Sequence, residues 1–174
     1  LAGNSATTSM SFTVSVTPAD VGPIVNPANG HSYYLLAAEP WTDAESDAIA
    51  LGGHLVTLVD ADENDWVWET FAPYSSGPVW IGLSDAAQEG AFVWTSGESS
   101  TYLNWWTAGG QPSNGGGIEN YTEMNNYVWN DNSGLAILPG VVEVVPEPGT
   151  TVAWAALATL ALWWRRRDGG GHAL

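Results

Sequence analysis

The chain has 174 residues, of which 45% are apolar and 13% charged, a composition that fits one folded, loop-rich domain with short appendages and argues against disorder. It contains no cysteine, so disulfides and thiolate metal sites are excluded. The formal net charge is −16, and Arg165, Arg166 and Arg167 are the only Lys or Arg residues, so we expect no nucleic acid as a partner, whereas the charge is compatible with a divalent cation. On charge alone, we favour the interpretation that acidity only keeps the chain soluble.

The N-terminal residues 1–21 predict a single strand that precedes the main domain. Residues 10–17 alternate Phe12, Val14 and Val16 with Ser and Thr, the pattern of a half-buried strand. The stretch AGNSATTSMSFTVSV resembles the closing strand of an immunoglobulin-like hyalin-repeat domain, and a plain linker strand is the alternative. Leu1 is not an initiator Met and no signal peptide follows it, so we expect the C-terminal piece of a longer precursor. Residues 21–30, rich in Pro and Gly, are predicted to be a linker.

Two helices are predicted next, each followed by extended chain. Thr42 is predicted as the N-cap of a helix over residues 43–51, with Glu45 in the reciprocal capping-box position and Gly52 and Gly53 ending the helix. A short strand is expected before it, over 33–36, and another after it, over 54–58. A second helix follows, with carboxylates at its N-terminus and an apolar side formed by Trp66, Val67 and Phe71.

The remainder of the domain predicts short strands around one long loop. Apolar or alternating runs occur at residues 79–83, 92–95, 121–124, 127–129 and 141–144. Helices followed by strands indicate an α+β domain. Residues 96–118 show no periodicity, and a loop of that length inside a compact domain is usually functional.

Eight short motifs stand out between residues 52 and 143. They are GGHLV (52–56), DENDWV (62–67), WIGL (80–83), EGAFVW (89–94), NWW (104–106), QPSN (111–114), WND (129–131) and GVVE (140–143). In this order they resemble the C-type lectin-like domain, which we assign to residues 22–144. The resemblance implies an α+β fold with two helices, small antiparallel sheets and a long ligand-binding loop. Because the cystines of the animal family are absent here, we expect tryptophan packing to hold the loops.

Oxygen-bearing side chains in and after the long loop suit calcium. Calcium takes six to eight oxygen ligands, and carboxylates that alternate with amide oxygens on irregular backbone provide them. Gln111, Glu119, Asn130 and Asp131 are such a set. The resemblance implies that these four bind one calcium ion and also bind the carbohydrate, because two sugar hydroxyls complete the metal shell. It further implies that Pro112 is a cis proline that orients the oxygens beside it.

Ser113 departs from the pattern of the family, which has Asn or Asp at this position. A hydroxyl is a weaker calcium ligand, so we expect low affinity unless Asn114 substitutes for it. The Gln of the Gln-Pro pair resembles the galactose-preferring form of the motif.

A second, auxiliary calcium position is implied for another group of side chains, and ordinary turn chemistry is its alternative. The group consists of Asp85, Glu89, Asn114 and Glu119. Trp105 and Trp106 are candidates for stacking on a sugar face, and we expect at least one of them to be core instead. His31 and His54 have no second ligand nearby in the sequence, and we expect both to be structural.

The tail, residues 145–174, carries a second set of signals. The sequence VPEPGT (145–150) precedes a predicted hydrophobic helix over 151–164 and then the three arginines. The thirteen apolar residues 152–164 span about 20 Å, short of the ~30 Å hydrocarbon core, so the helix is a marginal membrane anchor. The layout resembles the PEP-CTERM sorting signal of Gram-negative bacteria, and a simple short anchor is the alternative. The signal residues are Pro146, Glu147, Pro148, Arg165, Arg166 and Arg167.

Taken together, these patterns predict a non-enzymatic, calcium-dependent carbohydrate-binding module of a surface or matrix protein. The sorting signal implies exosortase as a partner during export, contact with the membrane before processing, and a final place on the bacterial cell surface, the outer membrane or the extracellular matrix. The alternative is a calcium-independent lectin-like domain that binds protein or is structural. Hydrolysis is disfavoured, since the carboxylates are better explained as ligands or surface groups.

Overall fold

The computed structural model describes residues 20–146. The strand predicted over 10–17, the hydrophobic helix 151–164 and the sorting residues from Glu147 onward lie outside the described residues. The elements, in chain order, are β1 (Val21–Val25), β2 (Ser32–Glu39), α1 (Trp41–Ala50), β3 (His54–Leu55), α2 (Ala61–Phe71), β4 (Val79–Ser84), β5 (Val93–Trp94), the 3-10 turns η1 (Thr107–Gly109) and η2 (Gly115–Gly117), β6 (Tyr121–Asn125), β7 (Val128–Asn132) and β8 (Leu138–Val144). Within residues 20–146 no helix is long and apolar enough to cross a membrane.

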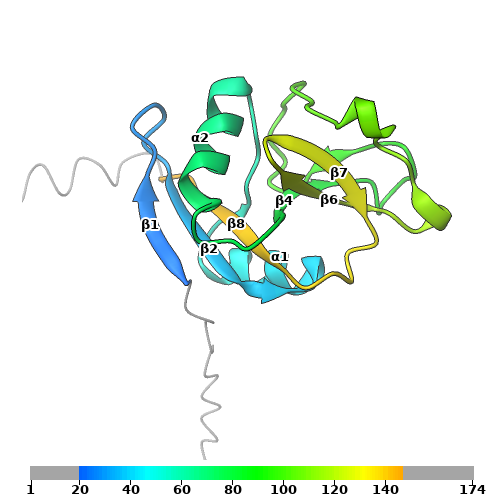
Figure 1. The fold of residues 1–174 in the computed structure, drawn as a ribbon. Helices are drawn as coiled ribbons and strands as arrows, with labels where there is room; N and C mark the ends of the chain where they lie inside the picture. The colour runs from blue at the N-terminus through cyan, green and yellow to red at the C-terminus, as the bar shows by residue number, and fades with distance from the viewer. Residues whose placement is uncertain (1–19, 147–174) are drawn as a thin grey trace, which may run out of the picture.

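The strands join into one mixed sheet with the order β1-β2-β8-β4-β6-β7. β3 pairs with β8 and β5 pairs with β4 at its sides. Every pairing is antiparallel except that of β4 with β8, which meet in parallel at Trp80 and Gly140. Figure 1 shows α1 and α2 beside the β1–β2–β8 part, while β4, β6 and β7 form the part next to the long loop. The two helices and the α+β class predicted from the motifs are therefore present in the described residues, whereas the strands form one mixed sheet in place of the predicted small antiparallel sheets.

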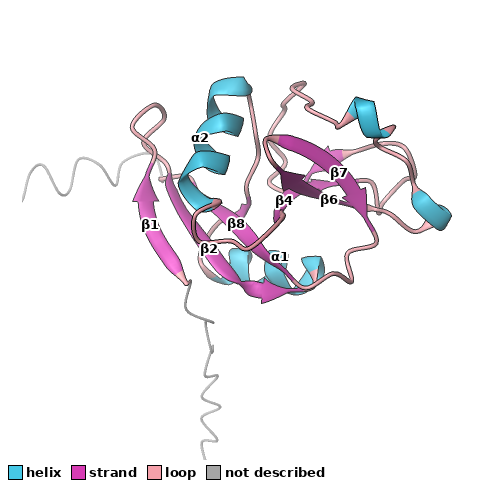
Figure 2. Cartoon of the chain, in the orientation of Figure 1, coloured by secondary structure: helices cyan, strands magenta, loops and turns pink. Residues whose placement is uncertain are grey.

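Two hydrophobic clusters form the core, one for each helix. Side chains alternate along β2 and β8, so that neighbouring residues point to opposite faces. Leu35 of β2 and Val141 of β8 belong to the cluster that contains Val67 and Phe71 of α2. On the other face, Trp41, Ala44 and Ala48 of α1 pack with Leu36, Leu55, Trp80 and Val142. The β2–β8 part of the sheet thus has a helix on each face, as the cartoon in Figure 2 also shows.

The linker predicted over residues 21–30 is wrong in its first half. Val21–Val25 forms β1, an edge strand that pairs antiparallel with β2, with Val21 opposite Leu35 and Ile24 opposite Tyr33. Val21 and Ile24 pack against the α2 cluster, and this burial compensates for a strand that contains Gly22 and Pro23. Proline is tolerated here because β1 is an edge strand with an irregular register between Val21 and Ile24.

The capping box predicted for α1 is also wrong. The helix begins at Trp41 after Pro40, and no side chain caps it. Glu45 is buried and instead bonds β3: its Oε2 accepts from the Leu55 N–H at 2.9 Å, and its Oε1 lies 2.7 Å from Nδ1 of His54. A buried carboxylate needs such partners more than an exposed helix end needs a cap.

A buried polar cluster ties α2 to the sheet. The hydroxyl of Tyr33 lies 2.5 Å from Oε1 of Glu63 and 2.8 Å from Oε1 of Glu143. Nδ1 of His31 lies 2.6 Å from the same Glu143 oxygen, and the Asn29 amide donates to both Tyr33 and Glu63. Burial raises the pKa of Glu63, although the hydrogen bonds from Tyr33 and from the Val59 N–H lower it. We call these five residues the Tyr33 cluster. The contact with Glu143 gives His31 a structural role, and the contact with Glu45 gives His54 one.

Candidate functional site

Trp129 anchors the long loop to the sheet. Its ring is fully buried and is contacted edge-on by Trp94, Tyr102 and Trp105, with centroid distances of 5.6 to 5.9 Å. Its indole N–H donates to Oδ1 of Asn64 in α2 at 2.8 Å. The aromatic packing that the sequence predicts in place of disulfides is therefore present, and Trp105 is the member of the Trp105–Trp106 pair that joins the core.

Asp131 holds the tip of the loop from the neighbouring strand. It follows Trp129 by two residues on β7, so its side chain leaves the same face of the strand, and it is only 1% exposed. Its two carboxylate oxygens accept the backbone N–H groups of Ser113, at 2.9 Å, and Asn114, at 2.6 Å. A buried carboxylate with no cationic side chain beside it is thus satisfied by loop backbone.

Glu119 closes the same loop from its other end. Its Oε2 accepts from the Ser113 hydroxyl at 3.0 Å and also from the N–H of Gly115. A Cβ on Gly115 would lie 2.7 Å from that oxygen, so a larger residue would require the Glu119 side chain to shift. The Glu119 N–H in turn donates to Oδ1 of Asn114 at 3.3 Å. Ser113, the residue that departs from the family pattern, therefore contributes a hydrogen bond to Glu119.

Gln111 and Asn130 present amide oxygens that no described donor reaches. The Gln111–Pro112 peptide is cis, as the resemblance implies. Oε1 of Gln111 is buried and lacks a hydrogen-bond partner. The Asn130 amide nitrogen donates to Oε1 of Glu123, at 3.2 Å, and to the Asp131 carbonyl, at 2.8 Å. With both amide hydrogens engaged, Oδ1 of Asn130 remains as an acceptor.

Of the auxiliary group, the structure brings Asp85, Asn114 and Glu119 toward one end of the loop. Asp85 is 2% exposed, and its backbone N–H donates to the carbonyl of Asn120, the residue after Glu119. One Asp85 oxygen accepts from the Gly90 N–H at 2.8 Å, while Oδ1 is buried without a partner. Glu89 is exposed in the turn after β4, and it makes no hydrogen bond to the loop in the described part of the chain.

The donor set fits a hard cation, although carboxylates alone do not provide it. Within residues 20–146 no group of three or more His, Cys, Asp or Glu side chains is placed to hold a metal. The predicted sets, however, include the amide oxygens of Gln111, Asn114 and Asn130. Two of the buried side-chain oxygens that lack a partner belong to Gln111 and Asp85. Unpaired buried oxygens in a region without Lys or Arg are suitable calcium ligands.

Glu123 is a neighbour of the site that the sequence interpretation did not single out. It lies on β6 and accepts the side-chain amides of Asn130 and Asn132, the latter at 2.9 Å. Burial raises the pKa of its carboxyl group, and the two amide hydrogen bonds oppose that shift. Its signal in the sequence is the alternation of 121–125, in which Thr122 and Met124 face the core and Glu123 does not.

Comparison with known proteins relates this chain to a described protein family. The family model described as "Lectin C-type domain" matches residues 37–136. The chain is 39% identical over 112 residues to a lectin from Pleurodeles waltl, covering 59% of this chain and 63% of that protein. It is 36% identical over 94 residues to an α-N-acetylgalactosamine-specific lectin from Patiria pectinifera, covering 49% and 55%. The matched part is thus less than two thirds of either relative's length.

Solved structures show the same fold. The C-type lectin CEL-I from Cucumaria echinata superposes with a TM-score of 0.62 and 30% identity, covering 66% of this chain and 90% of that one. A calcium-independent type II antifreeze protein superposes with a TM-score of 0.58 and 25% identity, covering 68% and 93%. The fold therefore occurs in proteins of different function, and the site residues have to distinguish between them.

Proposed function

The chain belongs to the C-type lectin domain family, and from this premise we propose that it is a calcium-dependent carbohydrate-binding module. The observation that carries the proposal is the buried, unpaired Oε1 of Gln111, in the same loop that Asp131 and Glu119 fix. A buried acceptor without a donor is costly, and a cation removes that cost.

In this proposal the principal calcium ligands are Gln111, Glu119, Asn130 and Asp131. Asp131 is able to keep its two backbone hydrogen bonds while it binds, because an ionised carboxylate has about four acceptor positions. When bound, calcium supplies a positive centre at which two sugar hydroxyls complete the coordination shell. The same four side chains position those hydroxyls, whereas Ser113 adds little to the binding of the metal. The auxiliary ion is assigned to Asp85, Asn114 and Glu119, with the exposed Glu89 as a further ligand.

We propose a galactose-type sugar as the ligand. The Gln-Pro pair at Gln111 and Pro112 supports this class, as does the likeness to a lectin specific for α-N-acetylgalactosamine. The module is not proposed to be an enzyme, in line with the lectin names of its relatives. We further propose an exported protein, sorted through the signal that begins at Pro146.

A glycan array, probed with and without calcium, tests the function. We expect galactose-type glycans to be bound in millimolar calcium and released by a chelator. Thermal unfolding provides the parallel measurement, since a ligand that binds only the folded state raises its stability. Chelator-insensitive binding together with no stabilisation by calcium would contradict the proposal.

A second function, calcium-independent binding of protein, is favoured by one observation. The hydroxyl of Ser113 and three backbone N–H groups already satisfy the Asp131 and Glu119 carboxylates, so the loop has partners without a metal. The likeness to a type II antifreeze protein that is described as calcium-independent supports this second function. Binding that persists in chelator distinguishes this function from the first.

A further inference from the structure

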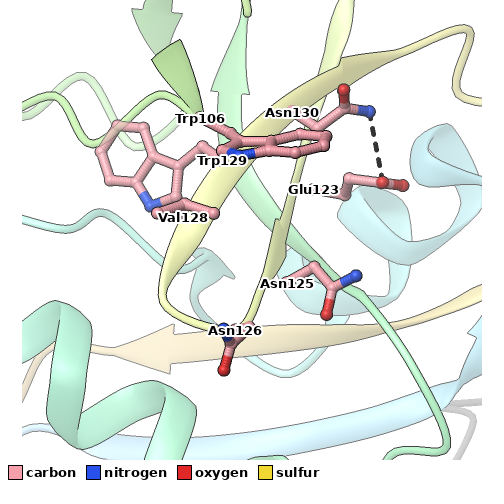
Figure 3. Close-up of a pocket in the computed structure, with 7 residues that line it drawn as sticks. All are labelled: Trp106, Glu123, Asn125, Asn126, Val128, Trp129 and Asn130. Carbon is pink, nitrogen blue, oxygen red and sulfur yellow. Dashed lines mark hydrogen bonds between the residues drawn. The ribbon is translucent and has the colours of Figure 1, made fainter. Parts of the chain in front are cut away.

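A cleft of about 470 Å³ opens beside the β6–β7 hairpin. This volume lies within the range of roughly 300–1,000 Å³ that is typical of small-molecule sites. Figure 3 shows its lining, which consists of Trp106, Glu123, Asn125, Asn126, Val128, Trp129 and Asn130. Asn130 is the one residue that the cleft shares with the proposed calcium ligands, so the cleft adjoins that site without repeating it.

Trp106 gives the cleft a fixed aromatic surface. Its side chain is 50% exposed, which is unusual for so large an apolar ring. The backbone around it is held on both sides: its N–H donates to the Trp129 carbonyl at 2.9 Å, and its carbonyl accepts from Gly109 and Gln111. The indole also packs against Gly109, where any Cβ would clash with the ring. A partly exposed ring held this firmly is suited to stacking on a ligand.

Polar groups line the rest of the cleft. Figure 3 shows the Glu123 carboxylate hydrogen-bonded to the Asn130 amide. Amides from Asn130 and Asn132 fix Glu123, which keeps acceptor capacity for further donors. Asn125 and Asn126 at the hairpin tip are exposed and offer both donors and acceptors. An aromatic face together with amides and a carboxylate matches a pyranose ring, which has apolar C–H faces and hydroxyl edges.

We propose that this cleft is a second sugar subsite, which binds the next residue of a neutral oligosaccharide whose terminal residue occupies the calcium site. The inference rests on the proposed function. Neutral sugars are favoured because residues 20–146 contain no Lys or Arg to pair with a uronate or sulfate, and because Glu123 would repel one. With this subsite, the module binds an oligosaccharide with higher affinity than its terminal sugar alone.

The test compares two affinities of the full chain in millimolar calcium. Calorimetry measures binding of galactose and of a neutral, galactose-terminated tetrasaccharide, and the readout is the ratio of the two dissociation constants. We expect the tetrasaccharide to bind at least about tenfold more tightly, equivalent to about 1.4 kcal/mol. Trp106→Ala should reduce this ratio to less than about threefold. Tyr74→Ala, which removes a ring of similar exposure outside the cleft, should leave it unchanged.

A second variant distinguishes the loss of the subsite from a folding defect in Trp106→Ala. Asn125→Lys places a long side chain at an exposed position on the cleft edge, away from the core, and should reduce the ratio similarly. A ratio near one in the wild type, or an unchanged ratio in both folded variants, overturns the subsite while leaving the galactose site intact. If the wild type binds neither probe, the proposed function and the subsite both fail.

Discussion

The Tyr33 cluster and the long loop both hold buried carboxylates without help from lysine or arginine, but their hydrogen bonding differs. In the Tyr33 cluster, Glu63 and Glu143 receive side-chain donors from a tyrosine, a histidine and an asparagine. In the loop, which we take as Gln111 to Glu119 with Asp131, the carboxylates receive mainly backbone N–H groups. The loop also leaves the Gln111 amide oxygen unpaired.

This difference indicates two roles for acidic residues in one chain. Carboxylates bonded by side chains from α2, β2 and β8 fasten those elements together, and no ligand is needed to complete them. Carboxylates bonded by loop backbone shape the loop around oxygens that have spare acceptor capacity. The loop therefore combines a defined shape with a deficit of donors, which is the condition in which a cation stabilises a site.

The largest effect is expected from Glu143→Ala in the Tyr33 cluster. Its removal leaves the His31 ring, the Tyr33 hydroxyl and the Thr57 N–H with one acceptor fewer each. Losing a buried acceptor costs about 1–3 kcal/mol per unpaired group, so we expect the free energy of unfolding to fall by about 3 kcal/mol. Urea unfolding measures this.

If the Tyr33 cluster and the loop are independent, Glu143→Ala should lose the same free energy of unfolding in calcium and in chelator. Glu69→Ala, at an exposed position on α2, is the matched control and should stay within about 0.5 kcal/mol of the wild type. A Glu143→Ala variant that lost its response to calcium would show that the two clusters are not separate.

Asp131→Asn, in the loop, should change the response of the protein to calcium. For a dissociation constant of about 1 mM, 10 mM calcium stabilises the wild type by about 1.4 kcal/mol. The variant loses a charge and one acceptor at the centre of the loop, so we expect this calcium-dependent increase to disappear. Thermal unfolding with and without calcium is the measurement.

Asp62→Asn is the control, since Asp62 is an exposed acid on α2, and it should keep the full calcium response. A calcium response that survives in Asp131→Asn would assign the ion to another part of the chain.

A smaller effect is expected in the pH dependence of the free energy of unfolding, and it arises from Glu63 in the Tyr33 cluster. Burial raises the pKa of Glu63, so the folded state holds the proton more tightly than the unfolded state does. The free energy of unfolding therefore falls as the pH rises from about 4.5 through the raised pKa of Glu63, and it stays lower at every pH above that pKa. Glu63→Gln has no proton to lose, and its stability should change less over this range. Glu69→Gln should retain the wild-type slope.

Local patterns in the sequence predicted the parts of the molecule that local chemistry determines. The carboxylates from Asp62 onward and the apolar side that ends at Phe71 predicted α2, and apolar or alternating runs predicted β4, β6 and β8 to within a few residues. The cis state of Pro112 followed from the lectin motifs. The usual burial of tryptophan in such a domain predicted that at least one of the pair at 105 and 106 is core, and Trp105 packs against the core.

What the sequence did not predict depends on partners far away in the chain. Glu45 fits a capping box by spacing, but its partners are His54 and Leu55 of β3. β1 contains the residues of a linker and forms only because β2 presents a free edge. Glu123 was missed for the same reason, since its role depends on the register that places Asn130 opposite it.

The smallest effect concerns Ser113, and it bears most directly on the loop. The carboxylate introduced by Ser113→Asp would face the Glu119 carboxylate, which now accepts the serine hydroxyl, so without calcium the variant should be less stable than the wild type. With calcium, an added charged ligand should lower the midpoint of a calcium titration by about threefold to tenfold. The two stability curves should therefore cross as calcium is added. Ser113→Ala, which loses the hydroxyl without gaining a ligand, should show no crossing, and parallel curves for Ser113→Asp would place the calcium beyond reach of residue 113.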